Sequence, residues 1–99
     1  MSEPRVPPHS VETEQAVLGG LLIDNAAWHR VSELIAETDF YREEHQTIYC
    51  HIKLLLEHGR PATINSVANA LDAAGEIAKT GGIEYLRELA GNAPPNDGI

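Results

Sequence analysis

The chain has 99 residues, which is enough for one small domain with a modest core and leaves little room for a deep catalytic cleft. Fifteen Asp and Glu against seven Lys and Arg give a formal charge of −8, the opposite of the balance that holds DNA phosphates. We therefore exclude autonomous DNA binding. The acidity either keeps the surface soluble or attracts a basic protein partner.

Cys50 is the only cysteine, so an internal disulfide is excluded. Residues 1–8 contain no apolar stretch that could serve as a signal peptide, and no run of about 18 apolar residues exists anywhere in the chain. We expect a cytoplasmic chain with no membrane association.

The first third of the chain predicts an arm and two helices. Residues 1–9 contain Pro7-Pro8 and are expected to form a flexible arm. Ser10 is a good N-cap for a first helix, in which apolar residues recur at helical spacing: Val17, Leu18, Leu21 and Leu22. Gly19-Gly20 inside this helix indicates either close approach of a neighbouring helix or a hinge. Asp24 or Asn25 should end it and cap a second helix, whose expected apolar side is Trp28, Val31, Leu34 and Ile35.

The remaining elements are also helical. A third helix is expected from about 43 to 58 with Gly59 as its C′ residue, and a fourth over 64–74, capped by Thr63 and ended by Gly75. Residues 76–80 could form one turn, and a last helix should run from about 83 to 90. The turn-rich residues 92–99 indicate the start of a linker. We expect an all-α fold, a compact orthogonal bundle of about six short helices, with its domain spanning 10–91.

None of the patterns that carry chemistry is convincing. His45, Cys50 and His51 are too unevenly spaced for a helical zinc site, and Lys79-Thr80 lacks the preceding glycine that a phosphate-binding loop needs. Glu12 and Glu14, like Glu43 and Glu44, are interpreted as helix-end charges rather than acid–base pairs. His45 is interpreted as a capping or packing residue. We therefore expect no catalytic residues, cofactor or metal in this chain.

Tyr85 is the one residue singled out for recognition. Ile83, Leu86, Leu89 and Ala90 supply the buried side of the last helix, which places Tyr85 at its margin. Aromatic residues at such a margin are good interface anchors, although a tyrosine that only packs at the edge of the core is equally compatible with the pattern.

Several blocks of residues together point to a known family. The first are residues 7–12, PPHSVE, and 14–22, EQAVLGGLL. The later blocks are Asp39-Phe40-Tyr41, His45 with Ile48-Tyr49, Gly59 with Pro61, Gly81-Gly82, Tyr85-Leu86 and Leu89. From about residue 6 to residue 95 these blocks resemble, in order and spacing, the N-terminal domain of bacterial DnaB-type replicative DNA helicases. Thr13 departs from the alanine that is more usual in the family.

The resemblance implies a longer parent protein, an ATP-dependent helicase that forms a homohexameric ring and unwinds DNA during bacterial replication. ATP, Mg²⁺ and DNA would be bound by a C-terminal RecA-like domain that is absent from this chain. The N-terminal domain would serve hexamer assembly and the docking of primase and of a helicase loader. In the family a helical hairpin follows this domain, and the sequence ends at Ile99 before that hairpin would begin.

Two alternatives remain open from the residues. The helicase-binding domain of a primase has a similar fold, although the blocks at residues 7–22 and 81–86 favour the helicase. A stand-alone enzyme is the other alternative, and nucleotide hydrolysis by this chain would support it.

Overall fold

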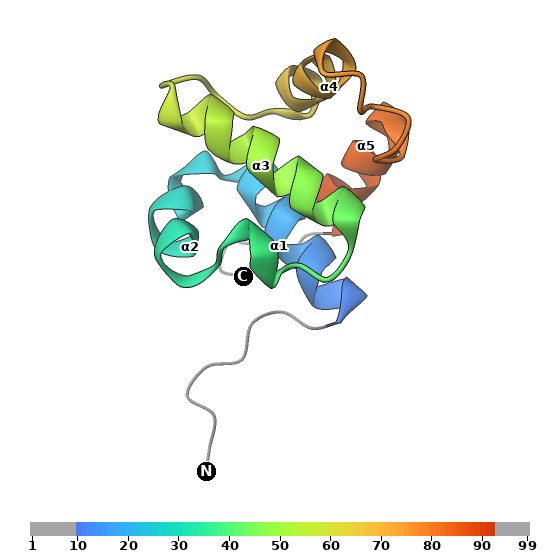
Figure 1. The fold of residues 1–99 in the computed structure, drawn as a ribbon. Coiled ribbons are helices and arrows are strands. Elements are labelled where there is room, and N and C mark those ends of the chain that lie inside the picture. Colours follow the sequence, from blue (N-terminus) through green and yellow to red (C-terminus); the bar gives the residue numbers. More distant parts are fainter. Residues whose placement is uncertain (1–9, 93–99) are drawn as a thin grey trace.

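The computed structural model describes residues 10–92, which contain five α-helices and two short 3-10 helices (Figure 1). In chain order they are α1 (Val11–Ile23), η1 (Asn25–Ala27), α2 (Trp28–Leu34), η2 (Glu37–Asp39), α3 (Glu43–Glu57), α4 (Ile64–Ala73) and α5 (Gly82–Asn92). No residue within 10–92 belongs to a strand. The all-α prediction is therefore confirmed, and none of the helices in these residues is long and apolar enough to cross a membrane.

The predicted count of about six helices is slightly too high. The sixth is the single turn expected at residues 76–80, and this segment remains a turn. It lies between Gly75 and Gly81, whose φ angles of 74° and 99° are in the left-handed region, so a helix cannot continue through either end. The predicted arm at residues 1–9 and the linker residues 93–99 lie outside the described residues, and Asn92 is the last residue of α5.

Local capping explains where the helices begin and end. The Ser10 hydroxyl accepts from the backbone N–H of Thr13 at 3.1 Å, as expected of the N-cap of α1. Thr63 and Ser66 form a reciprocal capping box at the start of α4, and Gly59 follows α3 with a φ of 73°. Asp24 ends α1 but caps η1 rather than α2 directly. These ends agree with the predicted ones to within one or two residues for α1, α3, α4 and α5.

The core lies where α1, α3, α4 and α5 meet. In Figure 1, α3 crosses in front of α1, while α4 and α5 lie beyond one side of it. The buried hydrophobic residues come from all four helices and from the segments that flank α3: Leu18, Leu21, Leu22, Phe40, Ile48, Tyr49, Ile52, Ala62, Val67, Ala68, Leu71, Leu86 and Leu89. α1 contacts both α3 and α5, so the positions of these two helices depend on it.

Two details of the predicted packing are wrong. The sequence pattern puts Leu34 on the apolar side of the second helix, yet 63% of it is exposed, because the seven-residue α2 ends there. Trp28 and Ile35 are only half-buried against the core edge, with the Trp28 ring 5.6 Å from that of Tyr49. Gly20 does not serve close approach of a neighbouring helix, because a Cβ there would meet nothing within 4 Å, whereas Gly19 is buried.

Candidate functional site

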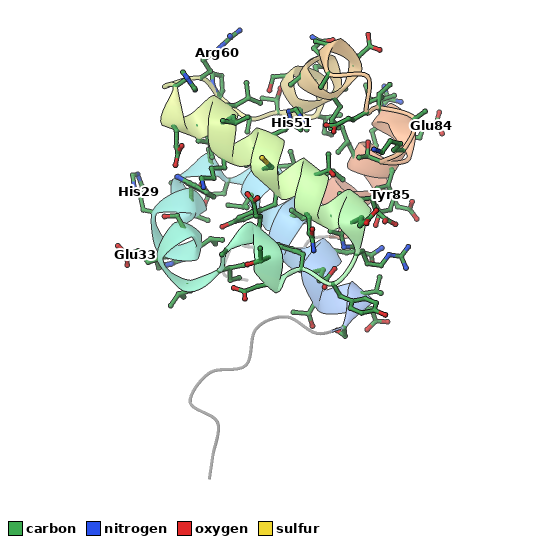
Figure 2. The ribbon with its side chains drawn as sticks, in the orientation of Figure 1. His29, Glu33, His51, Arg60, Glu84 and Tyr85 are labelled. Carbon is green, nitrogen blue, oxygen red and sulfur yellow. The ribbon has the colours of Figure 1, made fainter. Side chains whose placement is uncertain are left out.

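Tyr85 lies in α5 and is half-buried (Figure 2). Its ring is nearly parallel to the imidazole of His45 in α3. The ring centroids are 5.9 Å apart and the planes differ by 3°. The Tyr85 Oη lies 2.6 Å from His45 Nε2, and Gln15 Nε2 of α1 donates to the same oxygen at 3.2 Å. The predicted recognition residue is therefore tied to two other helices through its hydroxyl.

His45 connects Tyr85 to a carboxylate that solvent does not reach. His45 Nδ1 lies 2.7 Å from Glu14 Oε1, and both side chains are 0% exposed. The second carboxylate oxygen, Glu14 Oε2, accepts from the backbone N–H of Tyr41 at 2.6 Å. The network thus joins α1, α5, α3 and the segment that leads into α3.

One assignment of donors and acceptors satisfies the hydrogen bonds of this network. An ionised Glu14 can only accept, so His45 donates from Nδ1, which leaves Nε2 of a neutral imidazole as an acceptor. The Tyr85 hydroxyl then donates to Nε2, while its oxygen accepts from the Gln15 amide. Among the described residues no buried side-chain nitrogen or oxygen lacks a hydrogen-bond partner. A buried polar network of this kind is stabilising only when it is satisfied throughout.

The Glu14, His45 and Tyr85 side chains resemble an acid–base relay in composition, but their burial assigns them a structural role. A substrate atom would have to reach Glu14 or His45, and neither is exposed. What the network does is fix the rotation of α5, and with it the direction in which the edge of the Tyr85 ring meets solvent. The prediction that His45 packs inside the domain is confirmed.

Glu14 lies in the first turn of α1, as the helix-end interpretation requires, but its burial was not predicted. Glu12, two residues earlier, is exposed as expected, whereas Glu14 is fully buried because it shares the apolar face of α1 with Leu18 and Leu21. The spacing of four and then three residues along 14, 18 and 21 is the signal that could have identified a buried acid. Its partners are about thirty residues away along the chain, where no local pattern indicates them.

Gly81 provides the space that Tyr85 occupies. A Cβ at Gly81 would lie 2.7 Å from Tyr85 Cβ and 3.0 Å from Cγ, which is closer than real side chains approach one another. Its φ of 99° also disfavours any residue with a Cβ. The position of the Tyr85 ring therefore depends on Gly81 as well as on His45.

A second surface feature is a groove of about 680 Å³ between α3 and α4. Its apolar lining is Leu54, Leu55, Ala70, Ala73 and Ala74. The other three lining residues are His51, His58 and Arg60. Figure 2 shows His51 between α3 and α4 and Arg60 at the outer end of α3.

His51, His58 and Thr80 make hydrogen bonds within the domain. His51 Nε2 lies 3.0 Å from Glu76 Oε1, and His58 Nδ1 lies 2.7 Å from the carbonyl oxygen of Leu54. The Thr80 hydroxyl donates to the carbonyl oxygens of Glu76 and Ile77, which closes the turn before α5. Within residues 10–92 no three His, Cys, Asp or Glu side chains gather where they could hold a metal ion.

Fold and site together define a small all-α domain in which Glu14 and His45 are buried, while the Tyr85 ring and the α3–α4 groove lie at the surface. The chain belongs to the family of DnaB-like helicase N-terminal domains, because the model of that family matches residues 6–99. This membership favours the helicase interpretation over the primase alternative.

The relatives are replicative DNA helicases. The chain is 39% identical over 90 residues to the replicative DNA helicase DnaB of Buchnera aphidicola subsp. Schizaphis graminum, covering 91% of this chain and 19% of the relative. The DnaB helicase of Geobacillus stearothermophilus is 40% identical, with 91% and 20% covered. The chain thus spans about a fifth of the length of the curated relatives that it matches.

A solved structure shows the same fold. The N-terminal domain of DnaB helicase from Mycobacterium tuberculosis superposes with a TM-score of 0.85 at 40% sequence identity. The match covers 89% of this chain and 64% of that one. The fold expected from the sequence is therefore also that of a solved member of the family.

Proposed function

We propose that this chain is the docking and assembly domain of a replicative DNA helicase. The observation that carries the proposal is the family match over residues 6–99, together with the fold shared with a DnaB N-terminal domain. In this role the domain contributes to a homohexameric ring in the bacterial cytoplasm and offers surfaces to primase and to a helicase loader. DNA contacts and ATP-driven unwinding belong to a C-terminal domain of the parent protein.

The residues of this chain do not fit an ATP–Mg²⁺ site. Lys79 and Thr80 are the nearest approach to a phosphate-binding sequence, but Ala78 stands where a glycine is needed. The Thr80 hydroxyl, which would have to reach Mg²⁺, is committed to the carbonyl oxygens of its own turn. We therefore propose that ATP and Mg²⁺ are bound by another domain of the parent protein.

Capture experiments with the parent helicase test the docking role. The intact helicase should assemble as a hexamer and retain purified primase, whereas a version that lacks residues 10–92 should lose one or both properties. Sedimentation measures assembly, and fluorescence anisotropy of labelled primase measures docking. Unchanged assembly and unchanged primase affinity after the deletion would remove the proposal.

Tyr85 remains the residue we propose as a partner contact. Its half-buried ring reaches the surface beside α3, and its hydroxyl is held by His45. In the parent helicase, Tyr85→Ala should weaken primase or neighbouring-subunit binding about tenfold, as expected of an aromatic anchor. Tyr85→Phe keeps the ring but removes the hydroxyl that contacts His45, so it shows whether the ring itself makes the contact with the partner. Tyr41→Ala is the control, because it removes a tyrosine that is 84% exposed. Equal loss with Tyr41→Ala would argue against a specific contact at Tyr85.

A further inference from the structure

The groove between α3 and α4 is an apolar concavity that is open to solvent. Leu54 is 45% exposed at its edge, so part of its apolar surface remains in contact with water. On the opposite wall, α4 presents Ala70, Ala73 and Ala74. Small side chains on one wall and leucines on the other leave room for bulky apolar side chains from a partner helix.

The groove lacks the acidic side chains that dominate the rest of the chain, and Arg60 is its one formally charged lining residue among those described. None of the eight described residues that line it is acidic, in a chain with fifteen Asp and Glu. Arg60 and His58 flank one end, and Arg60 makes no ion pair with a carboxylate in residues 10–92. At the other end His51 is paired with Glu76.

Two neighbouring charged residues of α3 belong to another surface. Lys53 and Glu57 of α3 line a different depression, between α3 and the α2–η2 segment. His58 keeps its Nε2 available, because its Nδ1 is the atom that contacts the Leu54 carbonyl. A partner that brings a carboxylate to this end would meet a guanidinium and an imidazole rather than another acid.

We propose that the α3–α4 groove binds an amphipathic helix from a partner protein that carries leucine-type side chains on one face and Asp or Glu beside them. The apolar face would lie over Leu54, Leu55 and the alanines of α4, and the carboxylates would pair with Arg60 and His58. Such helix-in-groove recognition uses apolar anchors at helical spacing for affinity, while complementary charge sets orientation and specificity. The inference depends on the groove alone, which is separate from the Tyr85 network, so it goes beyond the proposed assembly role.

Two synthetic helical peptides provide the probe. Both are about five turns long with leucines at i, i+4 and i+7, and they differ only in carrying Glu or Lys beside the leucines. Each is labelled with a fluorophore and titrated with the 99-residue chain at about 0.15 M salt, where a Debye length of about 8 Å screens the long-range field of the −8 chain and leaves the close contacts. The Glu peptide should bind with a Kd of about 10–100 µM and the Lys peptide at least about tenfold more weakly.

Matched variants locate the binding site. Leu54→Glu should weaken Glu-peptide binding at least about tenfold, and Arg60→Glu about fivefold, with a gain for the Lys peptide. Leu34→Glu and Arg30→Glu are the controls, because Leu34 and Arg30 are exposed residues of the same types on α2. Both controls should leave the affinity unchanged, and circular dichroism checks that all four variants remain folded.

Each other outcome overturns the proposal. Equal binding of the two peptides, or no binding of the Glu peptide at about 1 mM, would show that the groove does not select an acidic helix. Equal losses for Leu54→Glu and Leu34→Glu would place binding elsewhere. If Leu54→Glu instead abolishes self-association seen by sedimentation of the chain alone, the occupant is a second copy and the acidic partner helix is wrong.

Discussion

Glu14 is the residue on which the arrangement of the polar network depends. A carboxylate that is 0% exposed is costly to desolvate, and it is tolerated only when hydrogen-bond donors replace the lost water. Here the donors are His45 Nδ1 and the Tyr41 N–H, at 2.7 and 2.6 Å. Because this acceptor is fixed inside the core, the Tyr41 N–H and the His45 imidazole must pack against it.

Replacing this carboxylate should be far more damaging than replacing its surface counterpart. Glu14→Gln keeps the shape but loses the charge that strengthens both bonds and brings an amide N–H toward groups that themselves donate. We expect the free energy of unfolding to fall by about 3 kcal/mol in a urea titration. Glu12→Gln, on the exposed side of the same helix turn, should change it by less than about 0.5 kcal/mol. Similar small effects for both would show that the network contributes little.

Tyr49 makes a second residue-scale prediction, about pH. Burial, together with the nearby Asp39 and Glu37 carboxylates, raises the pKa of Tyr49 to about 12 from 10.0. Its hydroxyl donates to the carbonyl oxygen of Ile35 at 2.6 Å. Because the folded state keeps this proton where the unfolded chain has lost it, the stability it contributes is present below about pH 10 and is lost as the pH rises toward about 12.

Comparison with Tyr49→Phe isolates that effect. The variant should be less stable than the natural sequence near neutral pH, since it loses a hydrogen bond worth about 1 kcal/mol. The difference in free energy of unfolding should shrink between about pH 10 and 12, as measured by chemical denaturation at each pH. A difference that stays constant over this range would contradict the raised pKa.

The residues of the polar network are only partly predictable from the sequence. The sequence indicates Tyr85 as a possible interface residue because it is an aromatic residue at a helix margin. It indicates His45 as a capping or packing residue because it lies near a helix start. The sequence predicts the same role for Glu14 and Glu12, because acidic residues in the first turn of a helix interact favourably with its dipole whether or not they are buried. The burial of Glu14 follows from the return of Tyr41 and His45 to α1, which is tertiary information.

At the scale of elements, the turn between α4 and α5 controls where Tyr85 lies. Gly81→Ala forces a Cβ to within 2.7 Å of Tyr85 Cβ and places it at a φ of 99°. We expect a loss of about 2–4 kcal/mol, combining backbone strain with displacement of the ring. Gly75→Ala is the control, since its φ of 74° carries similar strain while its Cβ would meet nothing within 4 Å.

The two glycine variants should differ in more than stability. Gly75→Ala should lose about 1 kcal/mol and leave the Tyr85 hydroxyl on His45. Gly81→Ala should change the NMR resonances of the His45 ring as well as the denaturation midpoint. If the two variants lose the same free energy, the close approach of Tyr85 to Gly81 is not tightly packed.

Element boundaries are well predicted where the end signal is local. The Thr63 cap, Gly59 and Gly75 mark α3 and α4 because each acts on its own backbone within a few residues. The buried face of α2 is poorly predicted, since its apolar pattern does not reveal that the helix stops at Leu34. Once the chain leaves the helix there, the Leu34 side chain stays largely exposed.

For the whole molecule, one hydrophobic cluster unites the helices. Buried residues of α1, α3, α4 and α5 form a single core, and Trp28 packs against its edge. We therefore expect one cooperative unfolding transition, with Trp28 fluorescence and helical circular dichroism giving the same midpoint. Two separated midpoints would show that the α2 region unfolds independently of the rest.

The way in which Glu14 holds the segment before α3 has a consequence for the outer surface. The carboxylate receives main-chain N–H groups, so it is indifferent to which amino acids supply them. The side chains at positions 41 and 42 project outward and are exposed. Substitutions at positions 41 and 42 should therefore preserve the contacts of Glu14 and the register of α3. This part of the surface can adapt to a new neighbour without a change in the core.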